Sequence, residues 1–147
     1  MALETVLLVG RPGDEGHGAK LAEAAIEIAK PAGARVIVGQ IFTDEEYDTA
    51  LTSLGIEDET GDRSEEIALE HGIFSSMVAR LDDEGVDYDL RTAVGRHKSS
   101  IVDLAAEADL LVIGGTKRSP AGKAVFGSST QDVLLEAPCP VVFVRRE

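Results

Sequence analysis

Residues Asp109–Ser129 read DLLVIGGTKRSPAGKAVFGSS, and this stretch decides the fold. It begins with a short apolar run over Leu110–Ile113, which is typical of a buried strand. A loop of glycine, hydroxyl and basic residues follows, and a helix is predicted to begin near Ser128. This order builds a place for an anion, because the first N–H groups of a helix have no partner within the helix.

The rest of the chain alternates between strands and helices. Apolar runs predict strands at Thr5–Val9, Arg35–Phe42, Tyr88–Val94, Leu110–Ile113 and Val141–Val144. Helical spacing of apolar residues predicts helices over about 16–30 and 64–84. Further helices are expected over about 44–54, 101–108 and 128–136. Helices are expected to stop at Pro31, Gly33 and Gly85. Capping boxes are expected at Thr43 with Glu46 and at Asp62 with Glu65. A helix cap is expected at Ser99 or Ser100.

This alternation indicates one α/β domain over residues 1–147. We expect an open sheet of five mostly parallel strands with helices on both faces. Ligands of such sheets bind beyond the carboxyl ends of the strands, where the winding of the chain reverses. The loops at that edge begin at Gly10, Phe42, Gly95 and Gly114.

The loop after Ile113 has the chemistry of a phosphate site. We expect a sharp turn at Gly114–Gly115, because glycine permits positive φ and close approach of a ligand. The loop and the helix start supply hydroxyls and cations, at Thr116, Ser119, Ser128, Ser129, Thr130, Lys117, Arg118 and Lys123. Ser128 is a natural N-cap, and the same N–H groups could instead hold a phosphate. The alternative is that the glycines only shape the loop and Ser128 only caps the helix.

The charge balance limits the class of partner. The chain has 27 acidic residues against 14 Lys and Arg, with a net charge of −13. Such a surface repels nucleic acid and anionic membranes, so we expect neither as a partner. The acidity favours a halophilic host, in which salt screens the repulsion, and an ordinary acidic cytosolic protein is the alternative.

Several observations favour the cytoplasm. No apolar run approaches the length of about 20 residues that a membrane span needs. The first residues lack a basic region followed by an apolar one, so no secretory signal is expected. Cys139 is the only cysteine, which excludes an internal disulfide. The sequence shows no set of metal ligands and no combination of nucleophile, base and orienting group.

Four segments resemble the universal stress protein family. They are Val94–Lys98 before the helical Ile101–Glu107, Ala108–Gly114, Phe126–Ser128 and Ala137–Val142. The resemblance covers nearly the whole chain, and with the acidity it indicates a haloarchaeal member. It implies the adenine nucleotide alpha hydrolase-like fold of that family, and a homodimer formed through Val141–Val144.

Nucleotide-binding members of this family carry the pattern Gly-x2-Gly-x9-Gly-(Ser/Thr). On this chain, the pattern falls on Gly114, on Lys117 in place of the second glycine, and on Gly127–Ser128. The resemblance implies ATP or another adenine nucleotide, with Mg accompanying it. The implied binding residues are Val9, Arg11, Ile41 and Ile113 near the adenosine, and Gly114, Thr116, Lys117, Arg118, Gly127, Ser128 and Ser129 near the phosphates.

Two positions depart from the family pattern. Arg11 stands where the family usually has Asp, and Lys117 stands where it has glycine. A lysine there either fills the space of a phosphate or binds it as a point charge. The resemblance thus implies a nucleotide-binding stress-response regulator. The alternatives are a dimer that acts by protein contact without a nucleotide, and a weak ATPase.

Overall fold

The computed structural model describes residues 3–10, 16–53, 72–115 and 128–145. It contains a five-stranded sheet of β1 (Thr5–Gly10), β2 (Arg35–Phe42), β3 (Tyr88–Val94), β4 (Leu110–Gly115) and β5 (Val141–Arg145). The strand order is β3-β2-β1-β4-β5, and every neighbouring pair is parallel. The expected α/β class and parallel sheet are confirmed.

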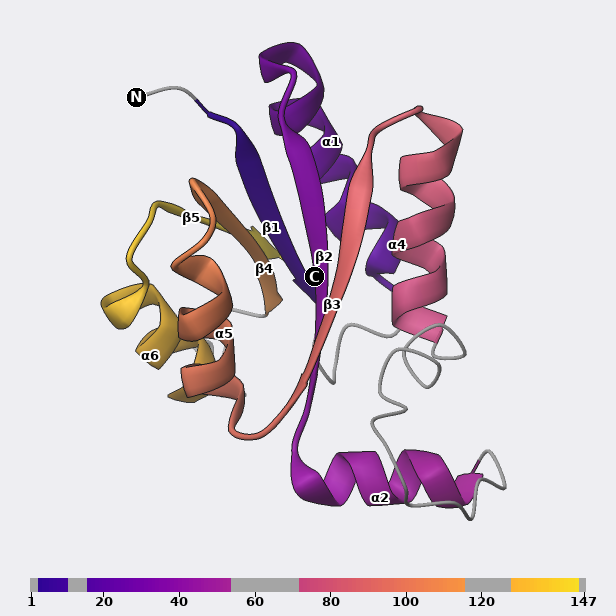
Figure 1. Cartoon of the computed structure of the whole chain (residues 1–147), viewed down its shortest axis with the longest axis vertical. Helices are drawn as coiled ribbons and strands as arrows, with labels where there is room; N and C mark the ends of the chain where they lie inside the picture. Colours follow the sequence, from indigo (N-terminus) through magenta and orange to yellow (C-terminus); the bar gives the residue numbers. More distant parts are fainter. Residues whose placement is uncertain (1–2, 11–15, 54–71, 116–127, 146–147) are drawn as a thin grey trace.

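Helices cover both faces of this sheet. They are α1 (Gly18–Ala32), α2 (Asp44–Ser53), α4 (Gly72–Asp83), α5 (His97–Ala105) and α6 (Ser128–Glu136). Helices α1 and α4 lie on one face, and α5 and α6 lie on the other (Figure 1). Helix α2 projects from the carboxyl end of β2, away from the two helical layers (Figure 1).

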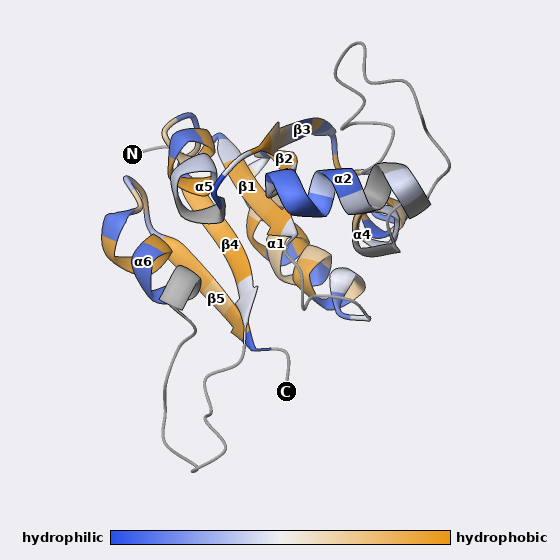
Figure 2. Cartoon of the chain, turned by 90° about the horizontal axis from the view of Figure 1, so that it is seen from below, coloured by the Kyte–Doolittle hydropathy of each residue, from blue (hydrophilic) through white to orange (hydrophobic). Residues whose placement is uncertain are grey.

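The apolar strands form two core layers because successive side chains of a strand point to opposite faces. In β1, Val6 and Leu8 belong to the cluster under α1 and α4. Leu7 and Val9 belong to the cluster under α5 and α6. Figure 2 shows the strands as the central apolar layer between the helices.

Helix α1 ends two residues later than the sequence predicts. Pro31 lies inside the helix, and Gly33 adopts the left-handed conformation directly after it. The N–H of Ala34 donates to the Ala29 carbonyl at 2.9 Å, and the N–H of Gly33 donates to the Lys30 carbonyl at 3.1 Å. These two bonds close a Schellman motif. The predicted stop at Pro31 was therefore wrong, and Gly33 ends the helix.

The capping box at the start of α2 is confirmed. The N–H of Thr43 donates to Glu46 Oε1 at 2.8 Å, and the N–H of Glu46 donates to Thr43 Oγ1 at 3.1 Å. Tyr47 then packs its ring against Phe42, at the end of β2, with the ring centroids 6.2 Å apart. The cap and the ring contact together fix the direction in which α2 leaves the sheet.

Helix α4 ends where the sequence predicts. Gly85, two residues after the last helical residue, has a φ of 66°, and the N–H of Val86 donates to the Leu81 carbonyl at 3.0 Å. The same Schellman arrangement thus closes α1 and α4. Residues 64–71, and the proposed cap of Asp62 with Glu65, lie outside the described residues.

Helix α5 begins earlier than predicted. The N–H of Gly95 donates to the Phe42 carbonyl at 2.7 Å, which continues the strand pairing to that residue. Arg96 is extended (φ −73°, ψ 135°) and takes the N-cap position, and the N–H of Ser100 donates to the Arg96 carbonyl. Ser99 and Ser100 therefore lie inside the helix, and their predicted role as caps was wrong. The helix also ends early, at Ala105, because 3₁₀-type bonds tighten its last turn.

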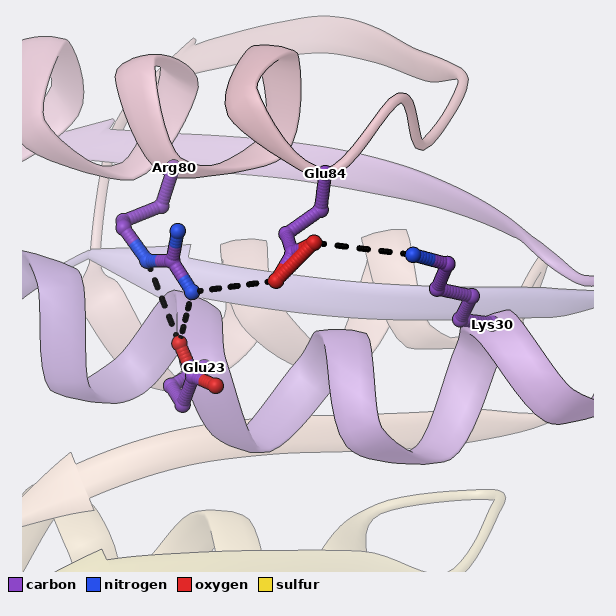
Figure 3. Close-up of polar contacts among 4 residues, drawn as sticks. All are labelled: Glu23, Lys30, Arg80 and Glu84. Atoms are coloured by element: carbon purple, nitrogen blue, oxygen red, sulfur yellow. Dashed lines mark hydrogen bonds and ion pairs between the residues drawn. The ribbon is translucent and has the colours of Figure 1, made fainter.

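An ionic network joins α1 to α4 (Figure 3). Arg80 of α4 donates through Nε to Glu23 of α1 at 3.1 Å, and a second, shorter contact joins the same two side chains. Arg80 also contacts Glu84 at 3.5 Å, and Glu84 contacts Lys30 of α1 at 3.5 Å. The side chains of the network are partly exposed, whereas Leu81 and Met77 of α4 are fully buried.

Candidate functional site: the carboxyl edge of the sheet

The winding of the chain reverses between β1 and β4. From β1 the chain proceeds to β2 and β3 on one side, and it then returns to add β4 and β5 on the other side. Pairing between β1 and β4 runs from Val6–Leu110 to Leu8–Val112. Beyond that pair β1 continues to Gly10 and β4 continues to Gly115. The two strands therefore stop pairing before they end, at the switch point where open α/β sheets bind ligands.

Gly114 and Gly115 extend β4 and do not form the expected sharp turn. Gly114 is in register with Val144, and Gly115 is in register with Arg145. Neither glycine has positive φ. The prediction of a turn at these residues was wrong, because pairing with β5 holds both in a strand. The strand β4 ends at Gly115.

Helix α6 points its N-terminus at the same edge. It begins at Ser128 and Ser129 and ends shortly before β5, whose first residues lie at the opposite edge of the sheet. Val133 is fully buried in the core layer that also holds Ile113. The helix thus directs its unpaired N–H groups, and the positive end of its dipole, towards the carboxyl edge.

The three apolar residues predicted to line an adenosine site lie together in the structure. Val9, Ile41 and Ile113 lie near the carboxyl ends of β1, β2 and β4, on the face that α5 and α6 cover. All three are 0% exposed and pack in one cluster with Ile101 of α5. Their side chains pack beneath α5. A ligand at this edge would therefore meet the strand ends and not an open apolar platform.

Five of the predicted binding residues cannot be placed. Arg11, Thr116, Lys117, Arg118 and Gly127 lie outside the described residues. Ser128 and Ser129 are the first residues of α6. Of the predicted phosphate-binding residues, Gly114, Ser128 and Ser129 can be placed in the fold.

Sequence reasoning missed a basic contact at this edge. Lys20, in the first turn of α1, donates through Nζ to the carbonyl of Arg145 at 2.7 Å. No acidic residue lies in that first turn. The contact places a lysine over the end of β5, beside the point where Gly115 pairs with Arg145. A lone lysine on a helix gives no sequence signal for such a contact.

A buried amide was also missed. Gln40 of β2 is 2% exposed, and the structure gives no hydrogen-bond partner for its Oε1. It lies in register with Gly10 at the carboxyl end of β1. Gln40 interrupts an otherwise apolar run over Val36–Phe42, and that interruption was the signal available in the sequence.

Within the described ranges, no group of three or more His, Cys, Asp or Glu side chains could hold a metal ion. No described helix is long and apolar enough to cross a membrane.

Cys139 is partly buried, and burial, followed by the charge of Asp109, raises the pKa of its thiol. A raised pKa disfavours the thiolate, so this cysteine lacks the character of a nucleophile.

The comparison with protein families agrees with this geometry. The model of the universal stress protein family matches residues 6–145. The chain belongs to the universal stress protein family. Sequence relatives agree: a universal stress protein of Mycolicibacterium smegmatis is 39% identical over 77 residues, and one of Thermus aquaticus is 42% identical over 53 residues.

These alignments cover only parts of the proteins. They take in 50% of this chain and 59% of the Mycolicibacterium protein, and 35% of this chain and 39% of the Thermus protein. The chain therefore spans 59% and 39% of the lengths of these two curated relatives.

Solved structures of universal stress proteins resemble the chain over its full length. One from Archaeoglobus fulgidus is 28% identical with a TM-score of 0.69, covering 98% of this chain and 99% of that one. An A. fulgidus universal stress protein in complex with dAMP is 22% identical, with a TM-score of 0.66 and coverage of 98% and 99%. A universal stress protein in complex with cAMP is 21% identical, with a TM-score of 0.65 and full coverage of both chains. At this identity, the latter two show the shared fold.

Proposed function

We propose that this universal stress protein binds an adenine nucleotide, ATP or a related one, and acts as a stress-response regulatory module in the cytoplasm. One observation carries the proposal. Strands β1 and β4 stop pairing after Leu8 and Val112, although both continue, at the switch point of the sheet. The N-terminus of α6 points to the same edge, and the complexes of two structural neighbours with dAMP and cAMP support an adenine nucleotide as the ligand.

The proposed site has one part for the phosphates and another for the adenosine. Phosphates would meet the first N–H groups of α6, with Gly127, Ser128 and Ser129 around them. Lys117 and Arg118 would supply positive charge in the loop, and Mg would accompany a triphosphate. The adenosine would lie at the ends of β1 and β2, near Arg11 and the backbone of Ile41.

The described residues fit such a ligand. Gly10 and Gly115 end the two strands that part at this edge, so neither strand end carries a side chain that would obstruct a ligand. Gln40, whose side-chain oxygen has no protein partner, is in register with Gly10. Buried polar atoms without a partner are uncommon, and a bound group that completes the hydrogen bond is one explanation for them.

The proposal is tested by a thermal-shift screen of ATP, ADP, AMP and cyclic nucleotides at high salt. Ligands that bind only the folded state raise the melting temperature. We expect Lys117→Ala to change that rise and the control Lys30→Ala to leave it unchanged, because Lys30 lies in the last turn of α1, at the opposite end of that helix from the site. Mass spectrometry of ligand retained after purification gives an independent readout.

We further propose that a second copy of the chain pairs along β5. This strand forms one edge of the sheet, and its side chains from Val141 to Val144 are partly buried. An apolar edge strand is a template for another strand. The protein would then act by contact between proteins, with or without a bound nucleotide.

The pairing has a specific test. The carbonyl of Pro140 accepts from Leu111 of β4, so the N–H of Val141, the next residue, faces the outer edge. Val141→Pro removes that outward donor and keeps the bonds to β4. Sedimentation should give a dimer of the 15.5 kDa chain for the wild type and a monomer for the variant. A wild-type monomer would contradict the pairing.

A further inference from the structure

Gln40 is the one buried polar side chain among the described residues. It is 2% exposed, and its Oε1 accepts no hydrogen bond from the protein. Val38 and Phe42, its neighbours along the same face of β2, belong to the core layer under α1 and α4. An amide oxygen that has lost water and found no partner destabilises the fold, so an apolar side chain of similar shape would suit this position better.

The position of Gln40 suggests what compensates for that loss. Gln40 lies near the carboxyl end of β2, in register with Gly10 on β1 and with Thr92 on β3. Gly10 is the last residue of β1, beyond the point where β1 stops pairing with β4. Gly10, the register partner of Gln40 on β1, adds no side chain beside it. Oε1 is buried in the ligand-free chain, so a donor group of a ligand would have to enter beside Gly10 to reach it.

We propose that Gln40 is a specificity-determining residue, whose Oε1 accepts a hydrogen bond from an N–H or O–H group of the bound nucleoside. The inference rests on the proposed nucleotide site and adds the group that selects the ligand. The favoured donor is the amino group of adenine, which an amide oxygen recognises well. A ribose hydroxyl is the other source of the same chemistry.

This role predicts discrimination between closely related nucleotides. Inosine monophosphate carries an oxygen where AMP carries its amino group. This oxygen and Gln40 Oε1 would then face each other as two acceptors, with no hydrogen to share. A site that leaves a buried polar group unpaired rejects the wrong ligand. We expect the wild type to bind AMP about tenfold more tightly than inosine monophosphate.

The test compares AMP, dAMP and inosine monophosphate by titration calorimetry at high salt. The variant Gln40→Leu removes the acceptor at similar volume, and Val38→Leu is the matched control, because it changes the same face of the same strand without removing a polar atom. We expect Gln40→Leu to reduce the preference for AMP over inosine monophosphate to about twofold or less, and Val38→Leu to keep it. If the donor is the ribose 2′-hydroxyl, Gln40→Leu will instead reduce a preference of AMP over dAMP.

A second readout does not depend on the ligand. Removing an unpaired buried oxygen should raise the melting temperature of the ligand-free protein, whereas removing a bonded one should lower it. Unchanged preferences in Gln40→Leu, with AMP still bound, would overturn the inference and leave the nucleotide site intact. Absence of binding of all three nucleotides to the wild type would overturn both.

Discussion

The side chain of Asp109 accepts a hydrogen bond from the backbone N–H of Thr5 at 3.0 Å, and the backbone N–H of Asp109 donates to the Thr5 carbonyl at 2.9 Å. The same carboxylate oxygen accepts from the N–H of Glu4 at 3.0 Å. Asp109 directly precedes β4, and Thr5 begins β1. The two residues therefore join the central strands at the amino edge, at the opposite end from the proposed site.

Replacing Asp109 with Ala should weaken the fold without weakening ligand binding. The substitution leaves two backbone donors without their partner, and we expect a loss of about 1–3 kcal/mol in the free energy of unfolding. Asp103→Ala, at an exposed position of α5, is the control and should stay within about 0.5 kcal/mol of the wild type. Urea unfolding measures both. Equal losses in the two variants would show that the Asp109 contacts are not stabilising.

Cys139 should make the protein less stable in alkali. Burial, and then the charge of Asp109, raises the pKa of the thiol in the folded state above its unfolded value of about 8.5. The stabilisation that comes from the neutral thiol is complete below the unfolded pKa, and it is lost as the pH rises through the folded pKa. Wild type should therefore lose more stability than Cys139→Ala between about pH 8 and pH 10, under reducing conditions. Parallel stability curves for the two proteins would refute this.

Gly39 should tolerate Ala and reject Val. A Cβ at Gly39 would lie 3.4 Å from Leu104 Cδ1, 3.5 Å from Leu7 Cδ1 and 3.6 Å from Val9 Cγ2, which are ordinary contacts. Gly39→Ala should thus be neutral or stabilise by up to about 1 kcal/mol, because it restricts the unfolded chain. The further methyl groups of Val have no room beneath α5, and Gly39→Val should cost about 1–3 kcal/mol. Equal stability of the two variants would contradict this packing.

The acidity of the chain predicts halophilic behaviour. With a net charge of −13, the folded chain repels itself, and salt screens this repulsion. The melting temperature should rise from about 0.1 M to about 1 M KCl, as the Debye length falls from about 10 Å to about 3 Å. Salt also screens the contacts of Arg80 with Glu23 and Glu84, so Arg80→Met should destabilise the protein more at low salt. An unchanged wild-type melting temperature would contradict the halophilic interpretation.

The sequence predicted those elements that local patterns determine. The apolar runs placed all five strands within two residues, and Thr43 with Glu46 predicted the start of α2. These features depend on residues that are close together in the sequence, so the sequence alone is enough to predict them. Likewise, Gly33 and Gly85 were identified as helix ends because the left-handed conformation suits glycine.

Features set by partners distant in the sequence were missed. Two successive glycines, Gly114 and Gly115, are a pattern typical of a turn in the sequence. Only their pairing with β5 makes them part of a strand. Ser99 looks like a cap, but pairing of Gly95 with Phe42 fixes where α5 begins. The isolation of Gln40 Oε1 depends on what β1 and β3 place beside it. In the candidate site, the sequence predicted the edge of the sheet and the helix that points to it, but not Gln40 or the contact of Lys20 with Arg145.

Isothermal titration of ATP into the purified protein at high salt tests the central claim most directly. We predict measurable heat with one nucleotide bound per chain, and a changed affinity in Lys117→Ala. Absence of heat with ATP, ADP, AMP and cyclic nucleotides alike would contradict the claim that the carboxyl edge of this sheet is a nucleotide site.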